Sequence, residues 1–343
     1  FLVPVPSPVT AAASSITATG ATLNGTVNAH GNSTTVTFSY GTTAAYGTNV
    51  AGTPSPVTGS TATNVSATLT GLTPNTTYHF RVNGESLAGV GNGGDLTFTT
   101  LGVPDIGVEQ PAGTSLTDGV SGVDFGGVLA GASSPAKSFK ITNTGSATLT
   151  LGTITIEGAN AADFTAGTPG SNSLAPGSST TFNVTFSPGA TGARSAALHI
   201  PSNVSGAKNP FDIALTGTGL SAIEDWRQTW FGTTANSGNA ADLFDFDLDG
   251  LVNLVEFAFG LNPTSNSAGL LPTPQIVGGN YVISFTPPAG VSGVTYGAQW
   301  STTLGALDWN AITDSDPSPT GYTFSVPIGS NPQLFMRLTV TRP

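Results

Sequence analysis

The feature that most constrains this chain is an alternation of apolar and polar residues that recurs along most of its length. Ala21, Leu23 and Val27 are separated by threonine, asparagine and glycine, and Tyr78, Phe80 and Val82 follow the same period. Successive side chains of a β-strand point to opposite faces, so this period predicts strands with one buried face. Two such sheets must stack to bury those faces. We therefore predict an all-β chain of three β-sandwiches in tandem.

The charge composition excludes several classes of partner. The 343 residues include 8 Lys or Arg and 19 Asp or Glu, which gives a net charge of −11. Charged residues make up 8% of the chain, against roughly 25% in ordinary soluble proteins. So few cations cannot neutralise a run of phosphates, and we expect no nucleic-acid partner. No stretch reaches the roughly 18 consecutive apolar residues of a membrane span, so we expect no membrane insertion.

Residues 11–102 carry a motif that joins a turn to a strand. Leu72, Pro74 and Thr76 precede Tyr78, an arrangement that resembles a tyrosine corner, in which the hydroxyl bonds back to the turn. With the strand phrases at 21–28 and 96–100, this region resembles a fibronectin type III domain of bacterial exoproteins. Residues 1–10 are apolar and proline-rich, and we expect them to form an extended N-terminal arm.

Residues 103–219 contain a second set of short strands. Several phrases resemble, in order, the choice-of-anchor D family, whose modules are immunoglobulin-like and related to those of Hydin: 123–126, 141–145, 160–164, 174–177, 184–188 and 214–219. The resemblance implies a second sandwich in a surface protein and implies no catalytic activity.

The pattern changes at residue 220. Ser221 and Glu224 have the spacing of a capping box, which predicts a helix that ends at Gly232. A second short helix is expected from Leu254 to Phe259. We expect residues 220–263 to form a helix–calcium loop–helix junction and residues 264–343 a third sandwich. Residues 221–343 resemble the C-terminal region of many bacterial exoproteins, which implies no enzymatic role.

One motif in this junction predicts a metal site. Residues 245–256 fit the twelve-residue EF-hand loop, with Gly250 at its sharp turn. The expected ligands are the side chains of five residues and one backbone carbonyl, that of Leu251: Asp245, Asp247, Asp249, Asn253 and Glu256. Ca²⁺ takes six to eight oxygen ligands, so we expect calcium as the cofactor. The alternative is a solvated acidic turn.

The calcium loop is expected to act as a clamp between the second and third sandwiches. Calcium sensors usually pair two EF-hands and expose an apolar groove, whereas this chain has one dockerin-like loop without a duplicate. We therefore expect calcium to make the junction rigid.

Catalytic motifs are missing from the sequence. The histidines, His30, His79 and His199, are spread over two sandwiches, and no G-x-S-x-G or H-E-x-x-H pattern occurs. Residues 89–94 match G-x-G-x-x-G, but a strand is expected after them instead of the helix that a dinucleotide site needs. We expect no catalytic residues and no enzyme activity.

Two features indicate partners. Trp226, Trp230, Trp300 and Trp309 lie in the last third, where they either pack in the core or stack on surface glycans. The apolar arm either folds back on its own domain or adds as a strand to a neighbouring copy, which would give a head-to-tail homopolymer.

We derive two expectations about the function of the chain. The chain has no cysteine and begins at Phe1 without a basic, hydrophobic leader, which fits a processed, secreted protein. We therefore expect a non-enzymatic structural protein on the cell surface or outside a bacterium, a subunit of a fibre. The alternative is a monomeric adhesin or carbohydrate-binding module.

Overall fold

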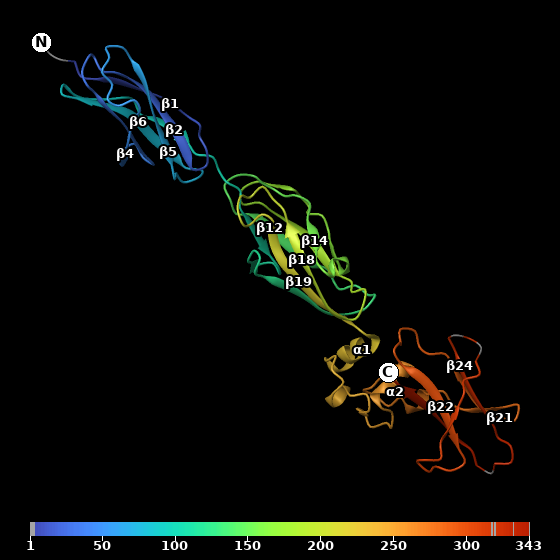
Figure 1. The fold of residues 1–343 in the computed structure, drawn as a ribbon. Coiled ribbons are helices and arrows are strands. Elements are labelled where there is room, and N and C mark those ends of the chain that lie inside the picture. Colours follow the sequence, from blue (N-terminus) through green and yellow to red (C-terminus); the bar gives the residue numbers. More distant parts are fainter. Residues whose placement is uncertain (1–3, 317, 319, 332, 343) are drawn as a thin grey trace.

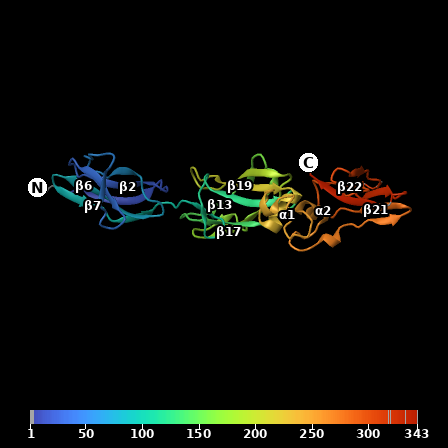
Figure 2. The same ribbon diagram turned by 90° about the horizontal axis from the view of Figure 1, so that it is seen from below.

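The computed structural model describes residues 4–316, 318, 320–331 and 333–342, and these form three β units in a row (Figure 1). The units follow one another from the N-terminus to the C-terminal end, and a second view shows the same succession (Figure 2). The prediction of an all-β chain of sandwiches is confirmed, with two α-helices at the start of the third unit.

The first unit is a sandwich of two antiparallel sheets. One sheet has the order β1 (Ser7–Ser14), β2 (Gly20–Asn28), β5 (Thr63–Thr70). The other has the order β4 (Thr48–Ala51), β3 (Thr35–Gly41), β6 (Thr77–Ser86), β7 (Gly89–Asn92), and β8 (Leu96–Thr99) also pairs with β6. The alternating apolar residues are buried between the sheets, and Leu23, Phe38 and Phe80 are fully buried. The expected tyrosine corner is present, because the Thr73 N–H donates to the Tyr78 hydroxyl at 3.1 Å.

The expected N-terminal arm of residues 1–10 is largely part of this unit. Residues 7–10 form the first half of β1 and pair with β2. Pro6 is buried, and its carbonyl lies so close to Gly91 that a Cβ there would meet it at 2.1 Å. Residues 7–10 thus belong to an edge strand of the first sheet. Residues 1–3 lie outside the described residues.

The second unit is a larger sandwich. Its five-stranded sheet has the order β10 (Ser115–Leu116), β9 (Ile106–Glu109), β12 (Lys137–Asn143), β17 (Ser179–Phe186), β15 (Phe164–Ala166). Its four-stranded sheet has the order β11 (Gly122–Leu129), β19 (Phe211–Leu220), β18 (Gly192–Ile200), β14 (Thr155–Glu157). β13 (Leu149–Thr150) pairs with β16 (Ser173–Leu174), and η1 (Ala161–Asp163) is a short 3₁₀ turn. Stacked aromatic pairs fill the core, such as Phe164 with Phe186, whose ring centroids are 4.8 Å apart.

A short connection joins the first two units. The Leu101 N–H donates to the Thr17 carbonyl of the first unit at 3.0 Å. The Ser146 N–H of the second unit donates to the Val103 carbonyl at 2.7 Å. Gly102 therefore lies between a residue bonded to one unit and a residue bonded to the other.

The third unit combines helices with two small sheets. The helical part contains α1 (Ala222–Phe231), η2 (Gly238–Ala240), α2 (Asn253–Phe259) and η3 (Ala268–Leu270). One sheet has the order β20 (Gln275–Val277), β21 (Asn280–Phe285), β24 (Tyr322–Pro327), and the other β23 (Asn310–Ile312), β22 (Thr295–Ser301), β25 (Phe335–Thr341). Ile223 of α1 packs with Leu254 and Phe257 of α2 in one core cluster, to which Val340 of β25 belongs. The helices are thus part of the core of this unit.

The two helices end as the sequence predicts. Gly232 and Gly260 cap α1 and α2 in the left-handed conformation, with φ values of 69° and 64°. At the start of α1, the Glu224 carboxylate accepts hydrogen bonds from the backbone N–H of Ser221 at 2.8 Å and from its hydroxyl at 2.7 Å. Within the described part of the chain, no helix has the length and apolar character that crossing a membrane requires.

Candidate metal centre

The acidic loop begins at Asp245 and folds through hydrogen bonds between its aspartates and its own backbone. Asp245 accepts from the Gly250 N–H at 2.9 Å, and Asp247 accepts from the Asp249 N–H at 3.2 Å. Gly250 has a φ of 94°, which side chains rarely adopt, so the turn favours glycine here. Each of these two aspartates uses one carboxylate oxygen to shape the loop and keeps the other.

The remaining oxygens gather at one place. Carboxylate oxygens of Asp245, Asp247 and Asp249 lie within 4.8 Å of one another. Asp245 Oδ1 and Asp247 Oδ2 are buried and have no hydrogen-bond partner within the described residues. Buried charged oxygens without a partner are costly, because burial removes their hydration. The loop therefore holds negative charge that its own hydrogen bonds leave uncompensated.

Glu256, on α2, brings a fourth carboxylate to the same cluster. Its side chain is fully buried, and its Oε2 has no partner among the residues that the structure describes. Burial, followed by the charge of Asp247, raises the pKa of Glu256 to about 7, and the other two aspartates act in the same direction. The hydrogen bond from Ser267 acts in the opposite direction.

Ser267 is a polar residue of this centre that the sequence analysis missed. It is buried, its N–H donates to Asp249 Oδ2 at 2.6 Å, and its hydroxyl donates to Glu256 Oε1 at 3.3 Å. The Ala268 N–H donates to the same Asp249 oxygen at 3.0 Å. The loop motif ends at Glu256, so its pattern gives no signal for a residue that only folding brings to the loop.

The two other expected ligands lie where the loop meets α2. The Leu251 N–H donates to Asp249 Oδ1 at 2.8 Å. Asn253 is buried, and its side-chain N–H groups donate to the carbonyls of Asn239 and Ala241, both at 2.8 Å. Its Oδ1 is a further buried oxygen without a partner in the described chain. The Asn253 side chain thus binds the segment before the loop through two hydrogen bonds, and its Oδ1 stays available as a ligand.

The expected helix–loop–helix differs from the structure on one side. α2 begins inside the loop motif, at Asn253, but α1 ends at Phe231, well before Asp245. Gly232 stops α1, and η2 and irregular chain connect it to the loop. A helix therefore leaves the loop, but none leads directly into it.

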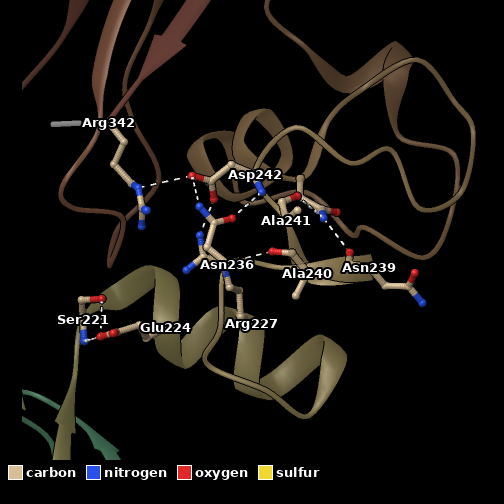
Figure 3. A network of polar contacts seen from close by, with 10 residues as sticks. Ser221, Glu224, Arg227, Asn236, Asn239, Ala240, Ala241, Asp242 and Arg342 are labelled. Carbon is tan, nitrogen blue, oxygen red and sulfur yellow. Dashed lines mark hydrogen bonds and ion pairs between the residues drawn. The ribbon is translucent and has the colours of Figure 1, made fainter.

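A network of charged residues connects this region to both helices and to the last strand (Figure 3). Arg227 of α1 is buried, donates to the Ala240 carbonyl at 3.1 Å and pairs with Asp242. Asp242 also faces Arg342, whose Nε lies 3.4 Å from its Oδ2. The backbone carbonyl of Asp242 accepts a hydrogen bond from the Leu254 N–H of α2 at 3.0 Å. The segment before the acidic loop is thus held by α1, α2 and the end of β25.

The donor set fits a hard cation. Every oxygen left without a hydrogen-bond partner in this cluster belongs to a carboxylate or an amide. The three aspartate carboxylates lie within 4.8 Å of one another, and Glu256 is linked to them through Ser267, which donates to both Asp249 and Glu256. Ca²⁺ prefers such oxygen ligands and tolerates irregular geometry, whereas Zn²⁺ in proteins is usually bound through cysteine or histidine. A bound cation would compensate the charge that the loop concentrates.

The histidines do not assemble a catalytic triad in the described residues. His79 pairs with Asp95 at 2.8 Å and His199 with Asp212 at 2.7 Å, each on a different unit. His30 instead bonds the Ser7 hydroxyl at 2.9 Å. No histidine joins a hydroxyl to a carboxylate within these residues, and so the geometry offers no Ser–His–Asp arrangement.

The fold defines a multidomain protein of β-sandwich units, with an immunoglobulin-like domain in the second unit. Residues 120–218, in the second unit, match the family model of the HYDIN/CFA65/VesB-like Ig-like domain. This match supports the Hydin-related resemblance of that unit. No curated protein matches the chain.

Solved structures of low similarity also align. The FN1–FN3 domains of chicken CNTN1 are 12% identical, and the match covers 98% of this chain and 93% of that one, with a TM-score of 0.27. A sensor domain of an anti-sigma factor from Pseudobacteroides cellulosolvens is 27% identical over 29% of this chain and 97% of that one, with a TM-score of 0.24. The VesB protease of Vibrio cholerae is 14% identical over 54% of this chain and 62% of that one, with a TM-score of 0.24. Values this low establish no shared fold.

Proposed function

We propose that this chain is a non-enzymatic extracellular structural protein of a bacterium, made rigid by calcium at the start of its third unit. The observation that carries this proposal is the set of buried carboxylate oxygens of Asp245, Asp247 and Glu256 that have no hydrogen-bond partner among the described residues. A cation bound by them would fix the acidic loop to α2. Through Ser267 and Asn253 it would also fix the segments on both sides of the loop.

Calcium would act on the connection to the second unit through α1. Arg227 bonds the segment that Asn253 fastens, and α1 contacts β11 and β19 of the second unit. With the dissociation constants of extracellular modules, about 10⁻⁴–10⁻³ M, millimolar calcium stabilises the third unit by roughly 0.4–1.4 kcal/mol. A free energy of this size is enough to stiffen the connection between the second and third units.

The test compares Glu256→Gln with the unchanged protein in millimolar calcium and in chelator. Calcium should raise the unfolding midpoint of the unchanged protein and leave that of the variant where it is. In chelator the variant should be at least as stable as the unchanged protein, because the substitution removes repulsion among buried carboxylates. All four tryptophans lie in the third unit, so their fluorescence reports its unfolding.

Glu224→Gln is the matched control, because Glu224 caps α1 and lies outside the acidic loop. It should lower the midpoint equally with and without calcium. An unchanged protein with the same midpoint in calcium, magnesium and chelator would refute the calcium site.

The proposal extends to assembly into a fibre. Val5, Leu87 and Val90 are exposed at 47%, 108% and 57% at one end of the first unit, and Val5 lies against Gly89. This end is the one remote from the second unit (Figure 1). Exposed apolar side chains at one end of a row of units support head-to-tail contacts between copies.

A further inference from the structure

Helix α1 presents two different faces. Ile223 and Arg227 are buried against the rest of the third unit. A second stripe of α1, at the spacing of successive helical turns, lines a pocket of about 320 Å³: Ala222, Asp225, Trp226, Thr229 and Trp230. Leu129 of the second unit, Phe257 and Gly260 at the end of α2, and residues 288–291 close the pocket. The acidic loop contributes none of these residues.

The pocket combines aromatic rings with one carboxylate. Trp226 is partly buried against the core cluster of Ile223, Leu254 and Phe257. It makes T-shaped contacts with Phe231 and Phe257, with centroids 5.6 and 5.9 Å away. Trp230 is 39% exposed and has no aromatic partner among the described residues. Asp225 is half-buried, and within the described chain its carboxylate makes no hydrogen bond or ion pair. No Lys, Arg or His is among the residues that line the pocket.

We propose that this pocket binds an organic ammonium group. The face of an indole attracts a cation through its quadrupole. An unpaired carboxylate beside two indoles adds direct charge complementarity. The same carboxylate disfavours anions. The proposal is independent of calcium.

A neutral sugar fits the pocket less well. Each sugar ring carries several hydroxyl groups that need directional partners, but the polar groups of the side chains lining the pocket are the Asp225 carboxylate, the Thr229 hydroxyl and the two indole N–H groups. The Thr229 hydroxyl already donates to the Asp225 carbonyl at 2.9 Å. A quaternary ammonium group has no N–H that needs an acceptor, so ring faces and one carboxylate are sufficient for it.

The experiment titrates the full chain with tetramethylammonium and choline and follows tryptophan fluorescence and calorimetric heat. Both probes should bind saturably in the millimolar range. The uncharged isostere of choline, in which carbon replaces nitrogen, should not bind. Asp225→Asn should weaken binding about tenfold, which corresponds to 1.4 kcal/mol. Butylammonium, as a mimic of a lysine side chain, distinguishes a protein ligand from a quaternary ammonium compound.

Trp309→Leu is the matched control, because Trp309 lies under Arg337, 4.1 Å from its guanidinium carbon, and outside the pocket. It should bind the probes as the unchanged protein does. Equal binding of choline and its uncharged isostere would overturn the proposal. Binding of methyl glycosides in place of the cations, or Asp225→Asn folded and with unchanged affinity, would also overturn it.

Discussion

Carboxylates in this chain are used sparingly and for definite tasks. Four of its 19 acidic residues lie in the acidic loop, and Asp242 and Glu224 each accept hydrogen bonds from fixed partners. In a chain with so few charges, a group of carboxylates with buried oxygens is not explained by solubility. The metal proposal therefore depends on Asp245 and Asp247, each of which has one carboxylate oxygen without a hydrogen-bond partner in the described chain.

At the residue scale, Tyr78→Phe should destabilise the first unit. Tyr78 is 8% exposed and accepts the Thr73 N–H, so the substitution leaves that donor without its partner. The expected loss is about 1–3 kcal/mol. Calorimetry of the full chain should show one transition shifted down and the others unchanged.

Tyr40→Phe is the control for this variant. Tyr40 packs near Tyr78 at a centroid distance of 6.5 Å, and its hydroxyl has no hydrogen-bond partner in the described part of the chain. Loss of the Tyr40 hydroxyl should change the free energy of unfolding of the first unit by less than about 0.5 kcal/mol. Both substitutions remove a hydroxyl and keep the ring, so equal effects would contradict a stabilising role of the Thr73–Tyr78 hydrogen bond.

At the scale of elements, α1 connects more of the molecule than its length suggests. One stripe is buried in the third unit, another lines the aromatic pocket, and the helix also contacts strands of the second unit. Arg227 is the residue that gives this helix a polar anchor inside the fold. Its partners are the Ala240 carbonyl and the Asp242 carboxylate.

Arg227→Met should therefore destabilise the third unit by about 3 kcal/mol. The substitution leaves Asp242 with weaker partners in a buried place, and breaking a buried ion pair is costly. Denaturation followed by tryptophan fluorescence measures the change. Arg342→Met removes a half-exposed partner of the same carboxylate, and it should cost less than about 1 kcal/mol. A larger effect at Arg342 than at Arg227 would contradict this account of the network.

At the scale of the whole molecule, the two connections between units differ. Gly102 lies between residues that are bonded to the first and second units. Only Ser221 separates β19 of the second unit from α1, but α1 belongs to the third unit and also packs against β11 and β19 of the second. A single glycine permits rotation, but a helix packed on both sides resists it. Any bending of the chain should therefore concentrate at residue 102.

The fibre proposal is tested by sedimentation of the full chain. It predicts species far above the 34.2 kDa of one copy at high concentration. Leu87→Asp with Val90→Asp should return the protein to one copy, because charge on the apolar end opposes contact. Val120→Asp, at a residue that is 80% exposed on the second unit, is the control and should leave the assembly intact. A single 34.2 kDa species at every concentration would refute assembly.

The sequence alone determined the class of fold, because a period of two is a local property that each strand carries by itself. It also determined the helix ends at Gly232 and Gly260, where only the backbone conformation of one residue matters. It predicted the aspartates of the acidic loop, since close spacing along the chain ensures that they meet. Ser267, the Arg227–Asp242 pair and the pocket on α1 were decided by tertiary structure alone. Their partners are distant in sequence, and no local pattern records which elements pack together.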